Sequence, residues 1–229
     1  MPRRRIDGVN GSFVRVKICC VASREEAALA VSAGADAIGF VSDMPSGGRT
    51  IPDTRIRELA ATCPPGVGRF LLTSLAEAGA IVKQAQYCGV DTIQLVDAVD
   101  PAVHREIKAN LPNVKIVQVI HITDRSVAGH AEAYWDVADA LLLDSGNPAL
   151  AVKALGGTGR VHDWTISREI VRSSPLPVFL AGGLTAENVA SAIETVRPFG
   201  VDVCSGVRST NGLDPDRLAR FMNNAQRAL

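Results

Sequence analysis

A repeated alternation of two segment types constrains the fold of this chain most strongly. Short apolar, β-branched runs recur along the whole sequence, and stretches with the spacing of amphipathic helices separate them. Eight such runs are predicted as strands: Val14–Cys19, Ala37–Val41, Val67–Leu72, Thr92–Leu95, Lys115–Ile120, Ala140–Asp144, Val178–Ala181 and Val201–Cys204.

These runs are nearly continuous in apolar residues rather than alternating, which is typical of a parallel sheet covered on both faces. Eight strand–helix units with right-handed crossovers close into a (β/α)8 TIM barrel. An open doubly wound sheet usually has fewer strands and a switch point, and no G-x-G-x-x-G follows the first strand. We therefore predict a single α/β barrel domain over residues 14–229, preceded by an N-terminal extension at residues 1–13.

Three helix starts are marked by local signals. Ser23 is placed to cap a helix over Arg24–Ala33, and a second helix over Thr54–Ala61 follows Pro52-Asp53. The Thr and Glu of Thr185–Asn188 have a spacing close to that of a third helix start.

Composition narrows the function classes. Lys+Arg and Asp+Glu both number 24, and no basic stripe with interleaved aromatic residues indicates a nucleic-acid partner. The N-terminus lacks the apolar stretch of a signal peptide, and no run reaches the length of a membrane span. The five cysteines lack metal-ligand spacing and are expected to be reduced thiols of a cytoplasmic enzyme, with no metal site.

Polar residues and glycines follow several of the predicted strands. Cys19 ends the first, Asp144 ends the sixth, and Gly182-Gly183 and Ser205-Gly206 follow the last two. In a parallel barrel all strands point the same way, so these residues meet at one rim, where barrel enzymes hold their active sites.

The glycine-rich turns indicate a phosphorylated ligand. Three such turns lie in the second half of the chain. They are Gly156-Gly157-Thr158-Gly159 in the longest connection, Gly182-Gly183 and Ser205-Gly206. Glycines let backbone N–H groups approach an anion closely, and barrels often bind phosphate at this corner. The alternative is that each glycine only permits a tight turn.

Three side chains are candidates for chemistry or binding: two at this rim and one in the loop Ser46-Gly47-Gly48-Arg49. Cys19 is a base or nucleophile if a neighbour lowers its thiol pKa, and otherwise a small packing residue. Asp144 closes an apolar strand, where a carboxylate needs a partner or a catalytic task. Arg49 can bind a carboxylate in bidentate fashion, although a solvated loop arginine is the commoner case.

The chain resembles the phosphoribosylanthranilate isomerase family of tryptophan biosynthesis over nearly its whole length from Val14. The matching motifs are Val16-Lys17-Ile18-Cys19, Gly34–Phe40, Gln94-Leu95, Leu141–Asp144, Gly156–Gly159 with Asp163-Trp164, Ala181–Leu184 with Glu187–Val189, and Val201–Val203 with Ser205–Val207.

The resemblance implies a cofactor-free Amadori rearrangement of a phosphoribosyl-aminobenzoate. It assigns Asp144 as the general acid that opens the ribose ring and Cys19 as the general base that removes the C2 proton. It also implies substrate contacts from Arg49, which matches the arginine at the anthranilate carboxylate, and from Gln94 and Asp202. The implied phosphate-binding residues are Gly157, Gly159, Gly182, Gly183, Ser205 and Gly206. We expect a small phosphorylated sugar as the partner, no nucleic acid or membrane, and either a monomer or a homodimer.

The sequence departs from the family pattern at four places. Cys20 replaces a Gly after the catalytic Cys, Val96-Asp97 replaces His-Gly, Arg208 replaces a Glu, and Gly212-Leu213-Asp214 replaces Gly-x-Lys-Asp. Two hypotheses follow. The first is an isomerase of the family's substrate, and the second is a divergent paralogue that acts on another N-linked phosphoribose or binds a phosphosugar without turnover.

Overall fold

The computed structural model describes residues 14–45, 47–146 and 162–228, and it places eight parallel strands of these residues in a closed barrel. Each strand pairs with the next one in sequence, and β8 pairs with β1 to close the ring. The prediction of a (β/α)8 TIM barrel is therefore confirmed. The strands are β1 Arg15–Ile18, β2 Ala37–Val41, β3 Gly68–Thr73, β4 Thr92–Leu95, β5 Lys115–His121, β6 Ala140–Asp144, β7 Val178–Leu180 and β8 Gly200–Val203.

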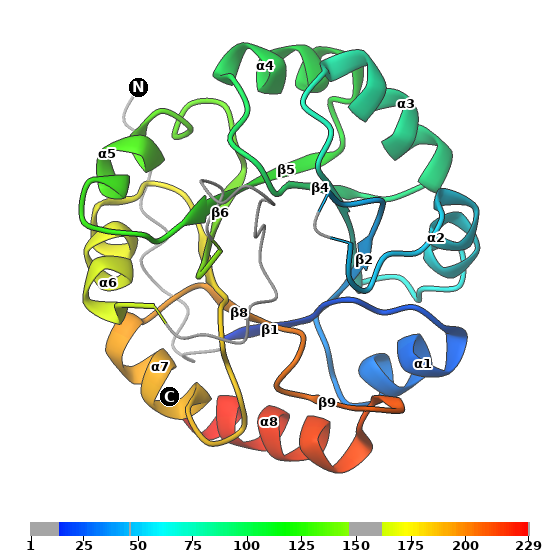
Figure 1. Cartoon of the computed structure of the whole chain (residues 1–229), viewed down its shortest axis with the longest axis vertical. Coiled ribbons are helices and arrows are strands. Elements are labelled where there is room, and N and C mark those ends of the chain that lie inside the picture. Colours follow the sequence, from blue (N-terminus) through cyan, green and yellow to red (C-terminus); the bar gives the residue numbers. More distant parts are fainter. Residues whose placement is uncertain (1–13, 46, 147–161, 229) are drawn as a thin grey trace.

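Helices surround the barrel on its outer side (Figure 1). Within the described residues they are α1 Arg24–Ser32, α2 Asp53–Ala60, α3 Ala78–Cys88, α4 Pro101–Asn110, α5 Val127–Glu132, α6 Trp164–Ser173, α7 Val189–Val196 and α8 Pro215–Arg227. None of these helices has the length and apolar character needed to cross a membrane.

Capping side chains set several helix starts. The Ser23 hydroxyl accepts a hydrogen bond from the N–H of Glu26 at 3.2 Å, so the predicted cap of α1 is confirmed. The predicted helix start at Thr185 is wrong, because α7 begins at Val189. Thr185 instead forms a parallel bridge with Gly206, and its N–H donates to the Asn188 side chain at 2.8 Å. These contacts hold the segment in a turn before the helix.

The barrel strands are buried on both faces, as their apolar sequences predict. Leu71, Ile93 and Leu141 face the helices in one large apolar cluster, and Phe70 and Phe179 belong to a second cluster. Because strand side chains alternate between faces, this second cluster fills the barrel interior.

A small antiparallel hairpin follows β8 before the last helix. It consists of β9 Arg208–Ser209 and β10 Gly212–Leu213. The N–H of Leu213 donates to the Glu26 carboxylate at 3.0 Å, so the hairpin is joined to α1 (Figure 1). A segment close to the C-terminus thus contacts the first helix of the barrel.

Candidate active site

A cavity of ≈ 390 Å³ lies at the carboxyl ends of the barrel strands. Its lining residues come from the ends of β2, β3, β4, β6 and β8 and from the connections that follow β1, β2, β4, β7 and β8. This is the end of the barrel at which the sequence predicts the site. The predicted site residues in its wall are Cys19, Arg49, Gln94, Asp144, Gly182, Gly183, Asp202 and Ser205.

The remaining predicted phosphate residues lie elsewhere. Gly206 does not line this pocket but a neighbouring hollow, which Ser205, Arg217 and Arg220 also line. Gly157 and Gly159 lie outside the described residues, as does the N-terminal extension at residues 1–13.

Asp144 ends β6 as a buried carboxyl, with 8% of the residue exposed. Burial raises its pKa, and the repulsion of Asp202 acts in the same direction. The N–H of Ser145, which donates to Asp144 Oδ1 at 2.7 Å, and the charges of His121 and Lys17 oppose this shift without cancelling it. The environment therefore favours a protonated carboxyl that can donate a proton into the pocket.

Cys19 directly follows β1, and its backbone N–H donates to the carbonyl of Val203 at 2.8 Å. This bond fixes the backbone of Cys19 against β8. The residue is buried, with 5% exposed, and its thiol lies beside Gly39 of β2. Cys19 is thus held at the pocket wall by contacts from two neighbouring strands.

Cys20, the neighbour of Cys19, has a left-handed backbone with φ of 62°. A side chain is disfavoured in this region of backbone space, where glycine is tolerated. Hydrogen bonds of its thiol with Cys19 and Cys204, together with burial, raise the pKa of Cys20 well above its usual value. Cys20 therefore stays protonated and is a poor candidate for the base.

Gln94 and Arg49 supply further polar groups to the pocket wall. Gln94 is buried, and its Oε1 atom has no hydrogen-bond partner among the described residues. Arg49 is exposed and follows Gly47 and Gly48, both of which have a positive φ. An acceptor and a cation are thus available to a polar, partly anionic ligand.

The glycine turns after β7 and β8 depend on glycine for steric reasons. At Gly182, where φ is 85°, a Cβ would lie 2.9 Å from the backbone nitrogen of Ser145. At Gly206 a Cβ would lie 1.9 Å from the carbonyl oxygen of Leu184. Larger residues at these two positions would displace the backbone that forms this corner.

Lys17, which the sequence does not single out as a candidate, contacts the pocket wall through Asp202. Its Nζ atom forms a 2.9 Å ion pair with Asp202, and its side chain has no exposed surface. The signal in the sequence was a single lysine within the apolar run of the first strand. A charge in such a run needs a partner or a function.

Within the described residues no group of three or more His, Cys, Asp or Glu side chains is arranged to hold a metal ion. The pocket instead combines a buried carboxyl, a thiol and a glycine corner at the mouth of a (β/α)8 barrel. This arrangement is that of a (β/α)8-barrel enzyme, with groups in its pocket that are suited to proton transfer.

Comparison with known proteins identifies the family within this class. The family of N-(5'-phosphoribosyl)anthranilate (PRA) isomerases matches residues 16–224, and the chain belongs to this family. An N-(5'-phosphoribosyl)anthranilate isomerase from Methanocella arvoryzae is 38% identical over 208 residues, which are 91% of this chain and 95% of the relative. The relative from Haloarcula marismortui is 38% identical over 218 residues, covering 94% and 98% of the two chains.

Solved structures agree with this assignment. Phosphoribosyl anthranilate isomerase from Thermotoga maritima superposes with a TM-score of 0.82 at 31% identity, covering 94% of this chain and all of that one. A phosphoribosyl anthranilate isomerase in complex with reduced 1-(o-carboxyphenylamino)-1-deoxyribulose 5-phosphate has a TM-score of 0.79 at 30% identity, with the same coverage.

Proposed function

We propose that this chain catalyses the Amadori rearrangement of N-(5'-phosphoribosyl)anthranilate to 1-(o-carboxyphenylamino)-1-deoxyribulose 5-phosphate in tryptophan biosynthesis. The observation that carries the proposal is the shared pocket of Cys19 and Asp144, in which burial raises the pKa of the Asp144 carboxyl. Membership of the isomerase family and the similarity to a ligand-bound isomerase support it.

In the proposed reaction each residue transfers one proton. Asp144 protonates the ribose ring oxygen, the bond from this oxygen to C1 breaks, and a Schiff base forms. The Cys19 thiolate then removes the C2 proton, which gives an enolamine, and tautomerisation of the enolamine yields the ketone. No net oxidation of the molecule occurs, because C1 is reduced as C2 is oxidised.

The binding residues are proposed on the same basis. Arg49 pairs with the anthranilate carboxylate, while Gln94 and Asp202 contact the sugar. Gly182, Gly183, Ser205 and Gly206, with Gly157 and Gly159, bind the phosphate through backbone N–H groups. The steric requirement for glycine at Gly182 and Gly206 supports a shaped corner at this place.

The pocket wall offers little support for the divergent-paralogue hypothesis. Of the two departures at the fourth strand, Val96 lines the pocket, but Asp97 is not among the lining residues. The Asp97 carboxylate instead accepts from the N–H of Ala98 at 2.9 Å. Repulsion of an anthranilate carboxylate by Asp97 is therefore not expected.

The proposal extends to the setting of the enzyme. The barrel is proposed as one domain over residues 14–229, in the cytoplasm, where the five free thiols would stay reduced. It is either a monomer or a homodimer, and a relative from Thermotoga maritima is described as dimeric. Sedimentation equilibrium would distinguish the two states.

The loss of phosphoribosylanthranilate fluorescence on mixing with purified enzyme tests the function. We expect turnover by the native chain, at least about a hundredfold loss of kcat in Cys19→Ser, and unchanged kcat in the control Cys63→Ser. Cys63 suits the control because it is a half-buried thiol that is not part of the pocket wall. A folded native chain without turnover would contradict the proposal.

A further inference from the structure

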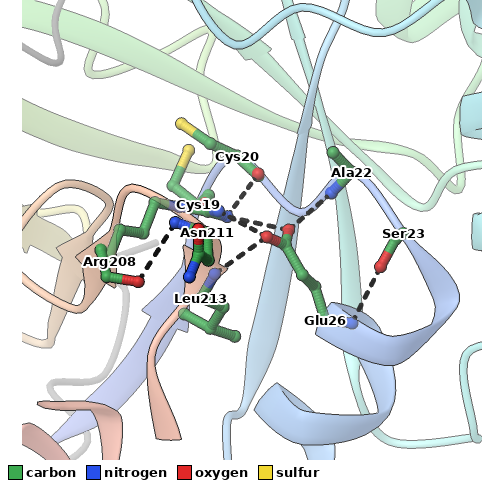
Figure 2. A network of polar contacts seen from close by, with 9 residues as sticks. Cys19, Cys20, Ala22, Ser23, Glu26, Arg208, Asn211 and Leu213 are labelled. Carbon is green, nitrogen blue, oxygen red and sulfur yellow. Dashed lines mark hydrogen bonds and ion pairs between the residues drawn. The ribbon is translucent and has the colours of Figure 1, made fainter.

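Arg208 of the β9–β10 hairpin reaches the end of β1, as Figure 2 shows. Its side chain is 3% exposed, and Nη2 donates to the backbone carbonyls of Cys19, at 3.3 Å, and of Cys20. The backbone carbonyls of the candidate base and of its neighbour are thus held by one guanidinium group. Arg208 lies 188 residues after Cys20 in the sequence.

Glu26 of α1 orients this guanidinium group. Its carboxylate oxygens accept from Arg208 Nη1 at 2.7 Å and Nη2 at 3.1 Å, which is a bidentate pair (Figure 2). The same carboxylate accepts from the N–H of Ala22 at 2.9 Å and of Leu213 at 3.0 Å. Burial disfavours its charge, but these bonds prevail and hold the pKa of Glu26 below its usual value.

The two side chains bracket the strained turn between β1 and α1. Arg208 binds the carbonyl of Cys20, whose φ is 62°, and Glu26 binds the N–H of Ala22 two residues later. A non-glycine residue stays in this backbone region only when its surroundings determine the conformation. Arg208 and Glu26 supply contacts of this kind on each side of the turn.

Stability alone is a weak explanation for this pair. Removing two charges from water is costly, and a buried ion pair is often no more stabilising than apolar residues of similar size. Arg208 also keeps its Nε atom buried without a hydrogen-bond partner among the described residues. What the pair supplies is a fixed backbone geometry for the turn at residues 19–22, which begins with Cys19.

We propose that Arg208 and Glu26 are positioning residues of the isomerisation, which hold the turn at residues 19–22 so that the Cys19 thiol faces the substrate. This inference rests on the proposed function, in which Cys19 is the base. Because Arg208 binds the carbonyl of Cys20, whose φ is positive, the two residues are expected to act together in this chain.

Steady-state kinetics of the variants Arg208→Met, Arg208→Lys and Glu26→Gln test the inference. Each variant is measured at a temperature below its unfolding midpoint. We expect kcat to fall at least about tenfold in Arg208→Met while KM changes less than about twofold, because positioning of the base affects the chemical step. Arg208→Lys should retain more activity, since one ammonium group can still reach a carbonyl. Adding Cys20→Gly to Arg208→Met should restore part of kcat, because glycine adopts the turn without support.

Arg69→Met is the matched control, because it removes an Arg–carboxylate pair, with Asp91 at 2.9 Å, away from the pocket. It should leave kcat unchanged. The inference is overturned if Arg208→Met and Glu26→Gln keep native kcat, or if Cys20→Gly restores nothing. A native chain without turnover would refute the proposed function instead. In that case the rate at which iodoacetamide alkylates Cys19 tests the positioning role. This role predicts that the rate in Arg208→Met differs from the rate in the native chain, and equal rates would refute it.

Discussion

Lys17 and Asp202 form a buried ion pair between the adjacent strands β1 and β8, where they are paired in register. Burial disfavours the charge of Lys17, but the attraction of Asp202 prevails and leaves the pKa of Lys17 above its usual value. The ammonium is therefore a permanent positive charge beside the pocket. A Cβ at Gly39 would lie 3.0 Å from Lys17 Nζ and 3.1 Å from Cys19 Sγ, so the charge lies close to the thiol.

Lys17→Met tests how much this pair contributes to stability. The substitution leaves the Asp202 carboxylate without its partner in a buried position, and we expect unfolding free energy to fall by about 3–5 kcal/mol. Urea denaturation at neutral pH measures the change. The double variant Lys17→Met/Asp202→Leu should recover much of this loss, because no unpaired charge remains. If Lys17→Met alone kept the native unfolding midpoint, the ion pair would not contribute to stability as described.

Gly39→Ala tests the close packing between Lys17 and Cys19. The added methyl group would meet Lys17 Nζ, Cys19 Sγ and the Leu72 side chain, all within 3.2 Å. We expect kcat to fall about tenfold as the thiol is displaced, since small displacements of a catalytic group are costly. Gly129→Ala in α5 is the control, because a Cβ there meets nothing within 4 Å. Equal kinetics of the two variants would show that this packing has no catalytic effect.

The fold could be predicted from the sequence because its signals are local. The runs Ala37–Val41, Thr92–Leu95 and Ala140–Asp144 were predicted with the bounds that β2, β4 and β6 have in the structure. Continuous apolar strands are typical of a covered parallel sheet, and their common direction places the strand ends at one rim. The helix start at Thr185 was wrong because a long-range bridge to Gly206 overrides the local capping signal.

The positioning contacts of the site could not be predicted in this way. Arg208 and Glu26 are 182 residues apart, and no local pattern relates them. The positive φ of Cys20 is equally hidden, since a cysteine gives no sign of a left-handed turn. Such features depend on the tertiary arrangement of the β9–β10 hairpin against α1, which the sequence alone does not reveal.

Asp144→Asn should lower kcat and raise stability together. Loss of the acid is expected to reduce kcat at least about a hundredfold. Burial raises the pKa of Asp144, so the folded protein keeps a proton that the unfolded chain releases above a pH of about 3.9. Native stability therefore declines as the pH rises from there through the folded-state pKa, and asparagine removes this decline.

Urea midpoints of the native chain and Asp144→Asn between pH 4 and pH 8 measure this effect. The variant should be the more stable protein at pH 8, and its advantage should shrink as the pH falls. A variant that is less stable at pH 8, or a difference that does not depend on pH, would show that the buried carboxyl is not penalised as described.

The double variant Val96→His/Asp97→Gly decides between the isomerase and the divergent paralogue. Val96 is 1% exposed in the pocket wall, and its carbonyl is paired with His121 Nε2 at 2.8 Å. A histidine at this position needs more space than valine, and Asp97 does not line the pocket. For an isomerase already adapted to phosphoribosylanthranilate, we expect kcat/KM to stay the same or fall by a few-fold. Asp97→Gly alone is the control and should have little effect on KM. A gain of more than about tenfold in kcat/KM would mean that the native wall opposes this substrate, and the divergent-paralogue hypothesis would then replace the proposed function.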